Sequence, residues 1–164
     1  MSRKKLLVFS LIFLCFATSS NGADIKAASC LRADVQAAIN SAVNGDRVLV
    51  PAGNCTWTSQ VVIPNTKGIT LQGAGIGVTI ITDGISSAST LQVNIKAGSI
   101  TFVTGFTFDA NSVAKSGANG EIEVVGGGLN SFRIHHNRIA NLRVRGIVTT
   151  AGGLAVSGLI DHNT

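Results

Sequence analysis

Two segments near the end of the chain decide the fold: Phe132-Arg133-Ile134-His135-His136-Asn137 and Gly158-Leu159-Ile160-Asp161-His162-Asn163. Each places an apolar residue among polar ones and ends in Asn, and segments 79–84 and 106–111 follow a similar pattern. If Ile81, Phe108, Ile134 and Ile160 are inward-pointing anchors, they are separated by 27, 26 and 26 residues. A period of this length, holding two or three short strands, is typical of one solenoid coil. The sequence therefore predicts an all-β parallel β-helix with coils about 4.8 Å apart.

The composition agrees with this architecture. The chain has 19 glycines, 13% charged residues and no tyrosine, which favours short strands joined by tight turns over a helical domain. Asn tolerates the left-handed backbone of a sharp turn and can hydrogen-bond to an Asn in the next coil. We therefore expect Asn111, Asn137 and Asn163 to form a structural ladder along the turns. Further strands are predicted at residues 47–50, 60–63, 68–71, 91–95, 122–125 and 146–149.

The first residues have the features of a secretory signal peptide, which we place at residues 1–23. A basic start, Arg3-Lys4-Lys5, precedes an apolar run of 12 residues, 6–17, and then small and polar residues. This run is too short to cross a hydrocarbon core of about 30 Å as a helix, although a membrane anchor is the alternative. We expect a secreted or extracellular protein, at the cell surface or in the periplasm in some hosts, with no stable membrane span after cleavage.

Removing this segment changes the charge balance. The 13 basic and 8 acidic residues of the whole chain become 10 and 8, because Arg3, Lys4 and Lys5 are lost. Net charge therefore does not indicate a nucleic-acid partner.

Cys30 and Cys55 are the two cysteines that remain, and in an oxidising compartment we expect them to form a disulfide. A catalytic or metal-binding role is the alternative. Asn54 begins a glycosylation sequon, which matters only in a eukaryotic host.

Residues 24–46 are predicted to hold a helix, because Leu31, Val35, Ile39 and Val43 recur every four residues before an Asn-Gly pair. Residues 47–164 hold the coils. The chain stops in mid-pattern at Thr164, so we expect the parent protein to continue with further coils.

Segments 33–40, 45–53, 68–75 and 134–137 resemble the pectate-lyase-like (pectin lyase fold) parallel β-helix superfamily. The resemblance covers nearly all of the mature chain, and it is specific for the fold and weak for any one activity. It implies a right-handed, single-stranded parallel β-helix with an N-terminal amphipathic capping helix. It also implies a carbohydrate-active protein, a polysaccharide lyase or glycoside hydrolase acting on an acidic polysaccharide. The alternative is a non-catalytic surface β-helix, such as an adhesin or a tailspike-like glycan binder.

Asp109, His135 and Asp161 each follow an anchor, and if the register holds they stack about 5 Å apart. A carboxylate and an imidazole at that distance can share a proton or bind a divalent cation, so these three are the candidate catalytic residues. The sequence defines no metal-ligand set and makes no cofactor evident; the resemblance implies Ca²⁺ if the protein is a lyase. The alternative is that these residues only suit a tight turn.

Four arginines are the candidate substrate-binding residues, because guanidinium groups suit the carboxylates of uronic acids. They are Arg133, Arg138, Arg143 and Arg145. The alternative is a solvated face with weak salt bridges to Glu121 and Glu123. Trp57, the one tryptophan, is expected to pack beneath the helix rather than to form a sugar platform.

Overall fold

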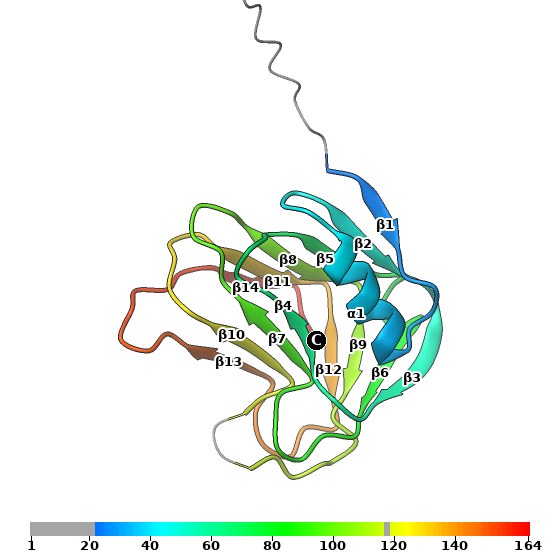
Figure 1. Ribbon diagram of the computed structural model, residues 1–164. Helices are drawn as coiled ribbons and strands as arrows, with labels where there is room; N and C mark the ends of the chain where they lie inside the picture. The colour runs from blue at the N-terminus through cyan, green and yellow to red at the C-terminus, as the bar shows by residue number, and fades with distance from the viewer. Residues whose placement is uncertain (1–21, 117–118) are drawn as a thin grey trace, which may run out of the picture.

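The computed structural model describes residues 22–116 and 119–164, so residues 1–21, most of the expected signal peptide, lie outside the described residues. The chain winds into a parallel β-solenoid of about five coils, with one short helix near the N-terminus (Figure 1). The expected β-helix is therefore confirmed.

Three parallel sheets run along the solenoid. Sheet A contains β1 (Asp24–Lys26), β2 (Arg47–Val50), β5 (Thr70–Gly73), β8 (Thr101–Thr104), β11 (Phe132–His135) and β14 (Leu159–Asp161). Sheet B contains β3 (Gly53–Trp57), β6 (Thr79–Asp83), β9 (Thr107–Asp109) and β12 (Arg138–Ala140). Sheet C contains β4 (Val61–Ile63), β7 (Leu91–Asn94), β10 (Ile122–Val125) and β13 (Ile147–Thr150). From β2 onward, each coil gives one strand to each sheet in turn.

The coils differ in length. In sheet A the register aligns Val48, Leu71, Val103, Ile134 and Ile160. These residues are 23, 32, 31 and 26 positions apart in the sequence, because the connections between strands vary in length. The core is built from the inward side chains of all three sheets, and each fully buried Val, Leu or Ile contributes about 1.5–3 kcal/mol.

The expected alignment of the four anchors is partly corrected. Ile81 aligns with Phe108 in sheet B, and Ile134 aligns with Ile160 in sheet A. Phe108 does not align with Ile134, because its next neighbour in sheet B is Ile139. The 26 residues between Phe108 and Ile134 therefore span a step from one sheet to another.

The helix, α1 (Arg32–Ser41), lies across the first coil (Figure 1). Val35, Ala38 and Ile39 are buried, as a capping helix requires. It ends before the expected Asn-Gly turn, and Val43 is exposed, because the backbone is already extended at Ala42. The Lys67 ammonium donates to the last carbonyl groups, those of Ile39, Asn40 and Ala42, and so satisfies the end of the helix at this point.

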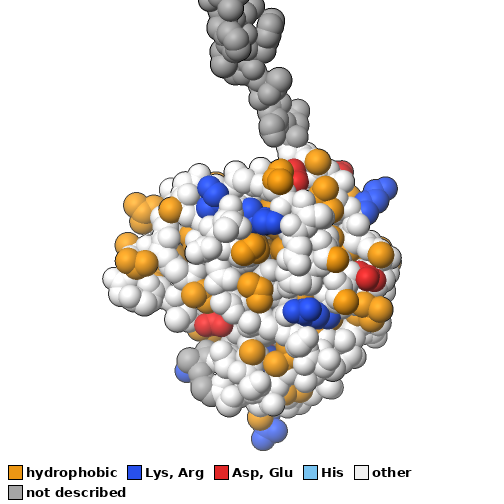
Figure 2. Space-filling model, viewed as in Figure 1, with side chains coloured by type: hydrophobic (Ala, Val, Ile, Leu, Met, Phe, Trp, Pro, Cys, Tyr) orange, Lys and Arg blue, Asp and Glu red, His pale blue; other side chains and the backbone are white. Residues whose placement is uncertain are grey.

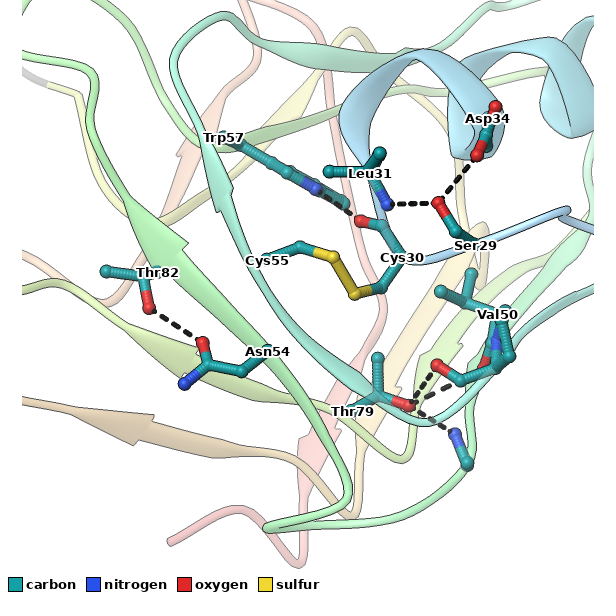
Figure 3. The surroundings of a disulfide bond; sticks show 12 residues. Ser29, Cys30, Leu31, Asp34, Val50, Asn54, Cys55, Trp57, Thr79 and Thr82 are labelled. Carbon is teal, nitrogen blue, oxygen red and sulfur yellow. Dashed lines mark hydrogen bonds between the residues drawn. A yellow bond between two sulfur atoms is a disulfide. The ribbon is translucent and has the colours of Figure 1, made fainter.

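Each sheet is closed differently at its N-terminal edge. β1 pairs with β2 in sheet A. In sheet C, the Gln36 side chain accepts from Val62 N at 2.9 Å and donates to Val62 O at 3.0 Å. Beside sheet B, the expected Cys30–Cys55 disulfide is confirmed, and the fully buried Trp57 donates from Nε1 to Cys30 O at 2.9 Å (Figure 3). These contacts occupy an edge that would otherwise offer unpaired backbone groups.

Candidate functional site

A polar cluster lies on the outer face of sheet A, at the corner where the chain turns into sheet B. Alternation along β11 buries Phe132 and Ile134 and turns Arg133 and His135 outward. His135 aligns with Thr104 in β8 and with Asp161 in β14. The structure therefore brings together two of the three candidate catalytic residues, His135 and Asp161.

Asp109 is not part of this cluster, which corrects the expected column. It ends β9 in sheet B, where it aligns with Thr82 and Ala140. Its Oδ1 accepts from the Asn141 side chain at 2.8 Å and from the backbone N of Asn111 at 2.9 Å. These are the contacts of a turn residue.

Asp161 forms a two-point ion pair with Arg133. Arg133 Nε lies 2.9 Å from Oδ1, and Nη2 lies 2.7 Å from Oδ2. This hydrogen bonding holds the pKa of Asp161 well below its usual range, assisted by His162 and opposed by partial burial. Asp161 also raises the pKa of Arg133. Both groups therefore stay charged, and Asp161 is a poor proton donor.

All three histidines of the chain belong to the cluster. The Nδ1 atoms of His135 and His136 are 2.7 Å apart, so one of them must carry the hydrogen between them. The rings of His136 and His162 stack, with centroids 5.0 Å apart and planes at 4°. His162 Nδ1 lies 2.6 Å from Asp161 Oδ2. A hydrogen-bonded and stacked path thus runs from His135 to Asp161.

His135 is suited to act as a base. Burial lowers its pKa, and the neighbouring Arg133 and His136 lower it further, so the imidazole is neutral at neutral pH. When its Nδ1 carries the hydrogen shared with His136, Nε2 is the basic nitrogen. A neutral histidine next to a guanidinium group can take a proton from a substrate whose anionic group the arginine attracts.

A shallow hollow of about 370 Å³ adjoins the cluster on the same sheet, within the usual size range of ligand sites. Phe102, Arg133 and Leu159 are among its lining residues. Phe102 meets His135 edge to face, with ring centroids 6.3 Å apart. The hollow therefore combines an aromatic ring and a cation, and the His135 imidazole lies beside it in contact with Phe102. Phe102 and Thr104 were missed from the sequence, although the alternating pattern of residues 101–104 indicates a strand.

The four candidate arginines do not share one face. Arg133 lies on sheet A, Arg138 lies on sheet B, and Arg143 and Arg145 lie in the connection between β12 and β13. On the face that α1 covers, Lys and Arg side chains are dispersed rather than gathered (Figure 2). Arg133 is therefore the arginine that the fold places beside His135.

The ladder of asparagines is formed by two of its three expected members. Asn163 Oδ1 accepts from Asn137 N at 3.1 Å and from Asn137 Nδ2 at 3.2 Å. Asn111 lies after β9, at another corner. The left-handed residues of the site's own turns are His136 and His162, with φ of 53° and 52°, so each histidine occupies the position that we expected for asparagine.

Expected Ca²⁺ does not fit this corner. Ca²⁺ takes six to eight oxygen ligands, whereas both carboxylate oxygens of Asp161 are bound by Arg133 and His162. Across residues 22–116 and 119–164, no three or more His, Cys, Asp or Glu side chains gather as metal ligands.

Within the part of the chain that the structure describes, no helix is long and apolar enough to cross a membrane. No protein-family model matches the chain, and no curated protein or solved structure does so either.

Proposed function

We propose that this is a secreted carbohydrate-active protein that binds an acidic polysaccharide on the outer face of sheet A and cleaves it by β-elimination. The observation that carries the proposal is that β11 turns Arg133 and His135 to the same outer face, beside a hollow that Arg133 and Phe102 line. The resemblance to the pectate-lyase-like superfamily supports the same substrate class. The disulfide supports export, because such bonds persist in oxidising compartments.

In the proposed reaction, Arg133 attracts the carboxylate of a uronate unit and offsets the charge that develops on it. His135 Nε2 takes the proton from the carbon next to that carboxylate. The electrons of the broken C–H bond form a C=C bond, and the bond from the neighbouring carbon to the glycosidic oxygen breaks. The departing oxygen takes a proton from protonated His135 or from water. The products are a new chain end and an unsaturated uronate, and no water is consumed.

The cluster fits a lyase better than a hydrolase. Most glycoside hydrolases use two carboxyl groups, one of which must hold a proton at working pH. Asp161 is the carboxylate beside the hollow, and Arg133 keeps it ionised. Asp109, the second expected carboxylate, lies on sheet B.

A second candidate is a non-catalytic glycan binder. The observation that favours it is that Asp161 already neutralises much of the charge of Arg133. In that case the face of sheet A would hold a polysaccharide without turnover.

The test is to incubate the purified protein with pectin and with alginate and to follow the ultraviolet absorbance of unsaturated uronates. We expect product from the wild-type protein, loss of product in His135→Ala, and unchanged product in the matched control Asp109→Ala. Binding without product would favour the glycan binder. Full activity in His135→Ala would remove this histidine from the mechanism.

A further inference from the structure

A second polar cluster lies inside the solenoid, between sheets B and C. Asp83 is an inward residue at the end of β6, and Glu121 immediately precedes β10. Lys115 enters from the connection between β9 and β10. The side chains of Lys115, Asp83 and Glu121 are 2%, 0% and 2% exposed. Only 13% of the residues in this chain are charged, yet three ionisable side chains are buried here. Their burial costs free energy unless charge pairing and hydrogen bonds compensate for the lost hydration.

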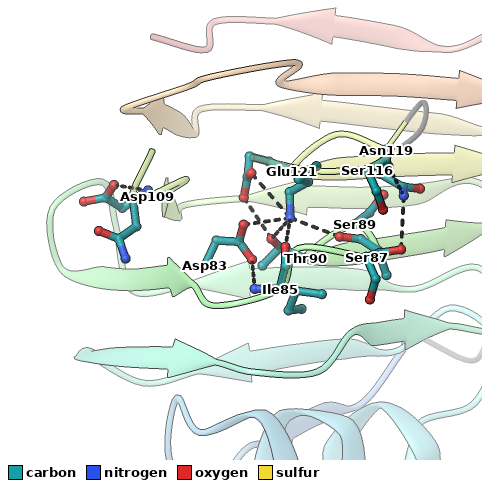
Figure 4. Close-up of polar contacts among 12 residues, drawn as sticks. Asp83, Ile85, Ser87, Ser89, Thr90, Asp109, Ser116, Asn119 and Glu121 are labelled. Carbon is teal, nitrogen blue, oxygen red and sulfur yellow. Dashed lines mark hydrogen bonds and ion pairs between the residues drawn. The ribbon is translucent and has the colours of Figure 1, made fainter. Parts of the chain in front are cut away.

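The lysine amine is held against both carboxyl groups. Lys115 Nζ lies 2.7 Å from Asp83 Oδ2 and 3.7 Å from Glu121 Oε1. Asp83, Thr90 and Glu121 converge at this point (Figure 4). Three further oxygen atoms fix the position of the amine: Ile85 O at 3.1 Å, Ala88 O at 3.0 Å and Thr90 Oγ1 at 3.3 Å.

The two oxygen atoms of Asp83 have different partners. Oδ1 accepts a hydrogen bond from Ile85 N at 2.9 Å. Oδ2 lies 2.7 Å from Lys115 Nζ in an ion pair. The amine is therefore held next to the carboxyl group, whose carbon is its electrophilic atom.

Glu121 is placed to move protons. Burial raises its pKa, and the charge of Asp83 raises it further. Thr90 Oγ1 holds its Oε2 at 2.8 Å, while Oε1 faces the lysine amine. A carboxyl group that is readily protonated, next to an amine and a second carboxyl group, can exchange a proton with each of them.

We propose that Lys115 and Asp83 join through an isopeptide bond, and that Glu121 is the catalytic residue that forms it. Proton transfer within the buried pair gives a neutral amine and a carboxylic acid. The Nζ lone pair attacks Cγ of Asp83, and Glu121 carries a proton from the nitrogen to the departing oxygen. The N–C bond forms, the C–O bond breaks and one water molecule leaves, so no oxidant or other reactant is needed. The bond ties β6 to the β9–β10 connection of the next coil.

The test is mass spectrometry of the denatured full-length protein, followed by trypsin digestion. Without the bond, trypsin cuts after Lys67, Lys96, Lys115 and Arg133 and releases peptides 68–96, 97–115 and 116–133. With the bond, trypsin cannot cut at the modified Lys115, and peptide 68–96 stays attached to 97–133 with the loss of one water.

Three variants sharpen the test. Asp83→Asn should form the same bond by losing ammonia and should reach the same final mass as the wild-type protein. Glu121→Gln, which keeps an acceptor for Thr90, should yield the separate peptides. Lys115→Met removes the cleavage site after residue 115, so it should yield unlinked peptides 68–96 and 97–133. Separate, full-mass peptides from the folded wild-type protein would overturn the proposal and leave a buried ion pair. A linked wild-type protein with a fully linked Glu121→Gln variant would overturn the role of Glu121.

Discussion

At the corner between sheets A and B, the adjacent residues His136 and Asn137 point in opposite directions, one toward solvent and one into the core. His136 adopts a left-handed backbone, with φ of 53°, and this turn exposes its ring. Asn137 follows and points inward, where it is fully buried. Its Nδ2 donates to Val103 O and His135 O, and its Oδ1 accepts from Phe106 N. The asparagine thus holds the turn that presents the histidines, and the left-handed conformation of His136 is supported by these contacts.

Asn137→Ala should therefore destabilise the protein by about 2–4 kcal/mol, because it leaves buried backbone groups without a partner.

A substitution of Asn111 tests whether this residue lies outside the asparagine ladder. It is exposed and has φ of 49°, so Asn111→Gly keeps the backbone donor and relieves strain. We expect that variant to change stability by less than about 1 kcal/mol. Urea unfolding of both variants is the measurement, and equal losses would contradict this assignment.

Arg133→Met should raise the pKa of His135. The substitution removes a positive charge and leaves the Asp161 carboxylate uncompensated, and both changes favour the imidazolium form. Histidine ring NMR during a pH titration measures the shift, and Arg138→Met on sheet B is the matched control. An unchanged or lower pKa in Arg133→Met would contradict the electrostatics described for the site.

The same shift has a pH consequence for folding. Because the pKa of His135 is lowered in the folded protein, the unfolded chain binds this proton more readily. The contribution of His135 to stability is therefore fully present above the ordinary histidine pKa, and it is lost as the pH falls through the folded-state value.

Most strands could be predicted from the sequence, but the predicted column of Asp109, His135 and Asp161 was partly wrong, because Asp109 lies on another sheet. Short apolar runs bounded by turn residues located the strands around Val48, Leu71 and Val93, and a four-residue apolar spacing located the helix around Val35. Strands β1, β3, β8 and β12 were not predicted. A fixed period could not assign Phe108 to its sheet, because corners in different sheets share one local pattern.

That shared pattern has a physical cause. Asn111 lies two residues after β9, His136 directly follows β11, and both residues are left-handed, with φ of 49° and 53°. A strand that runs into polar residues and a left-handed turn has the same sequence pattern at both corners. The connections between strands, which set the length of each coil, vary. Lys115 and Asp83 were not predicted to meet for the same reason, since their contact depends on the path of the β9–β10 connection.

The capping helix protects sheet C through one side chain. Gln36→Ala removes the donor and the acceptor that pair with both backbone groups of Val62. We expect a loss of about 1–3 kcal/mol, because this partly buried edge loses its hydrogen bonds. Ser41→Ala, at an exposed position of the same helix and without a hydrogen bond to Gln36, is the control and should cost much less. Thermal unfolding would decide between them, and similar values for the two variants would argue against edge protection.

Over the whole molecule, the disulfide fastens the segment before α1 to the first coil (Figure 3). The two cysteines are 25 residues apart. Chain-entropy arguments give about 3 kcal/mol for a loop of this size. The double variant Cys30→Ala/Cys55→Ala should lose about that much free energy of unfolding, measured in urea. Chemical reduction of the wild-type protein should produce a similar loss, and no loss in either experiment would contradict a stabilising role.

We propose that acidic polysaccharide binds at the corner of sheet A that holds His135, His136 and His162. The most direct measurement is an NMR titration of the ¹⁵N-labelled full-length protein with a short oligogalacturonate, which reports binding whether or not turnover occurs. We predict that the largest amide shifts centre on Phe102, Arg133 and His135, and that they weaken in Arg133→Met. Shifts centred on Arg143 or on sheet C, or no shifts at saturating ligand, would contradict binding at this corner.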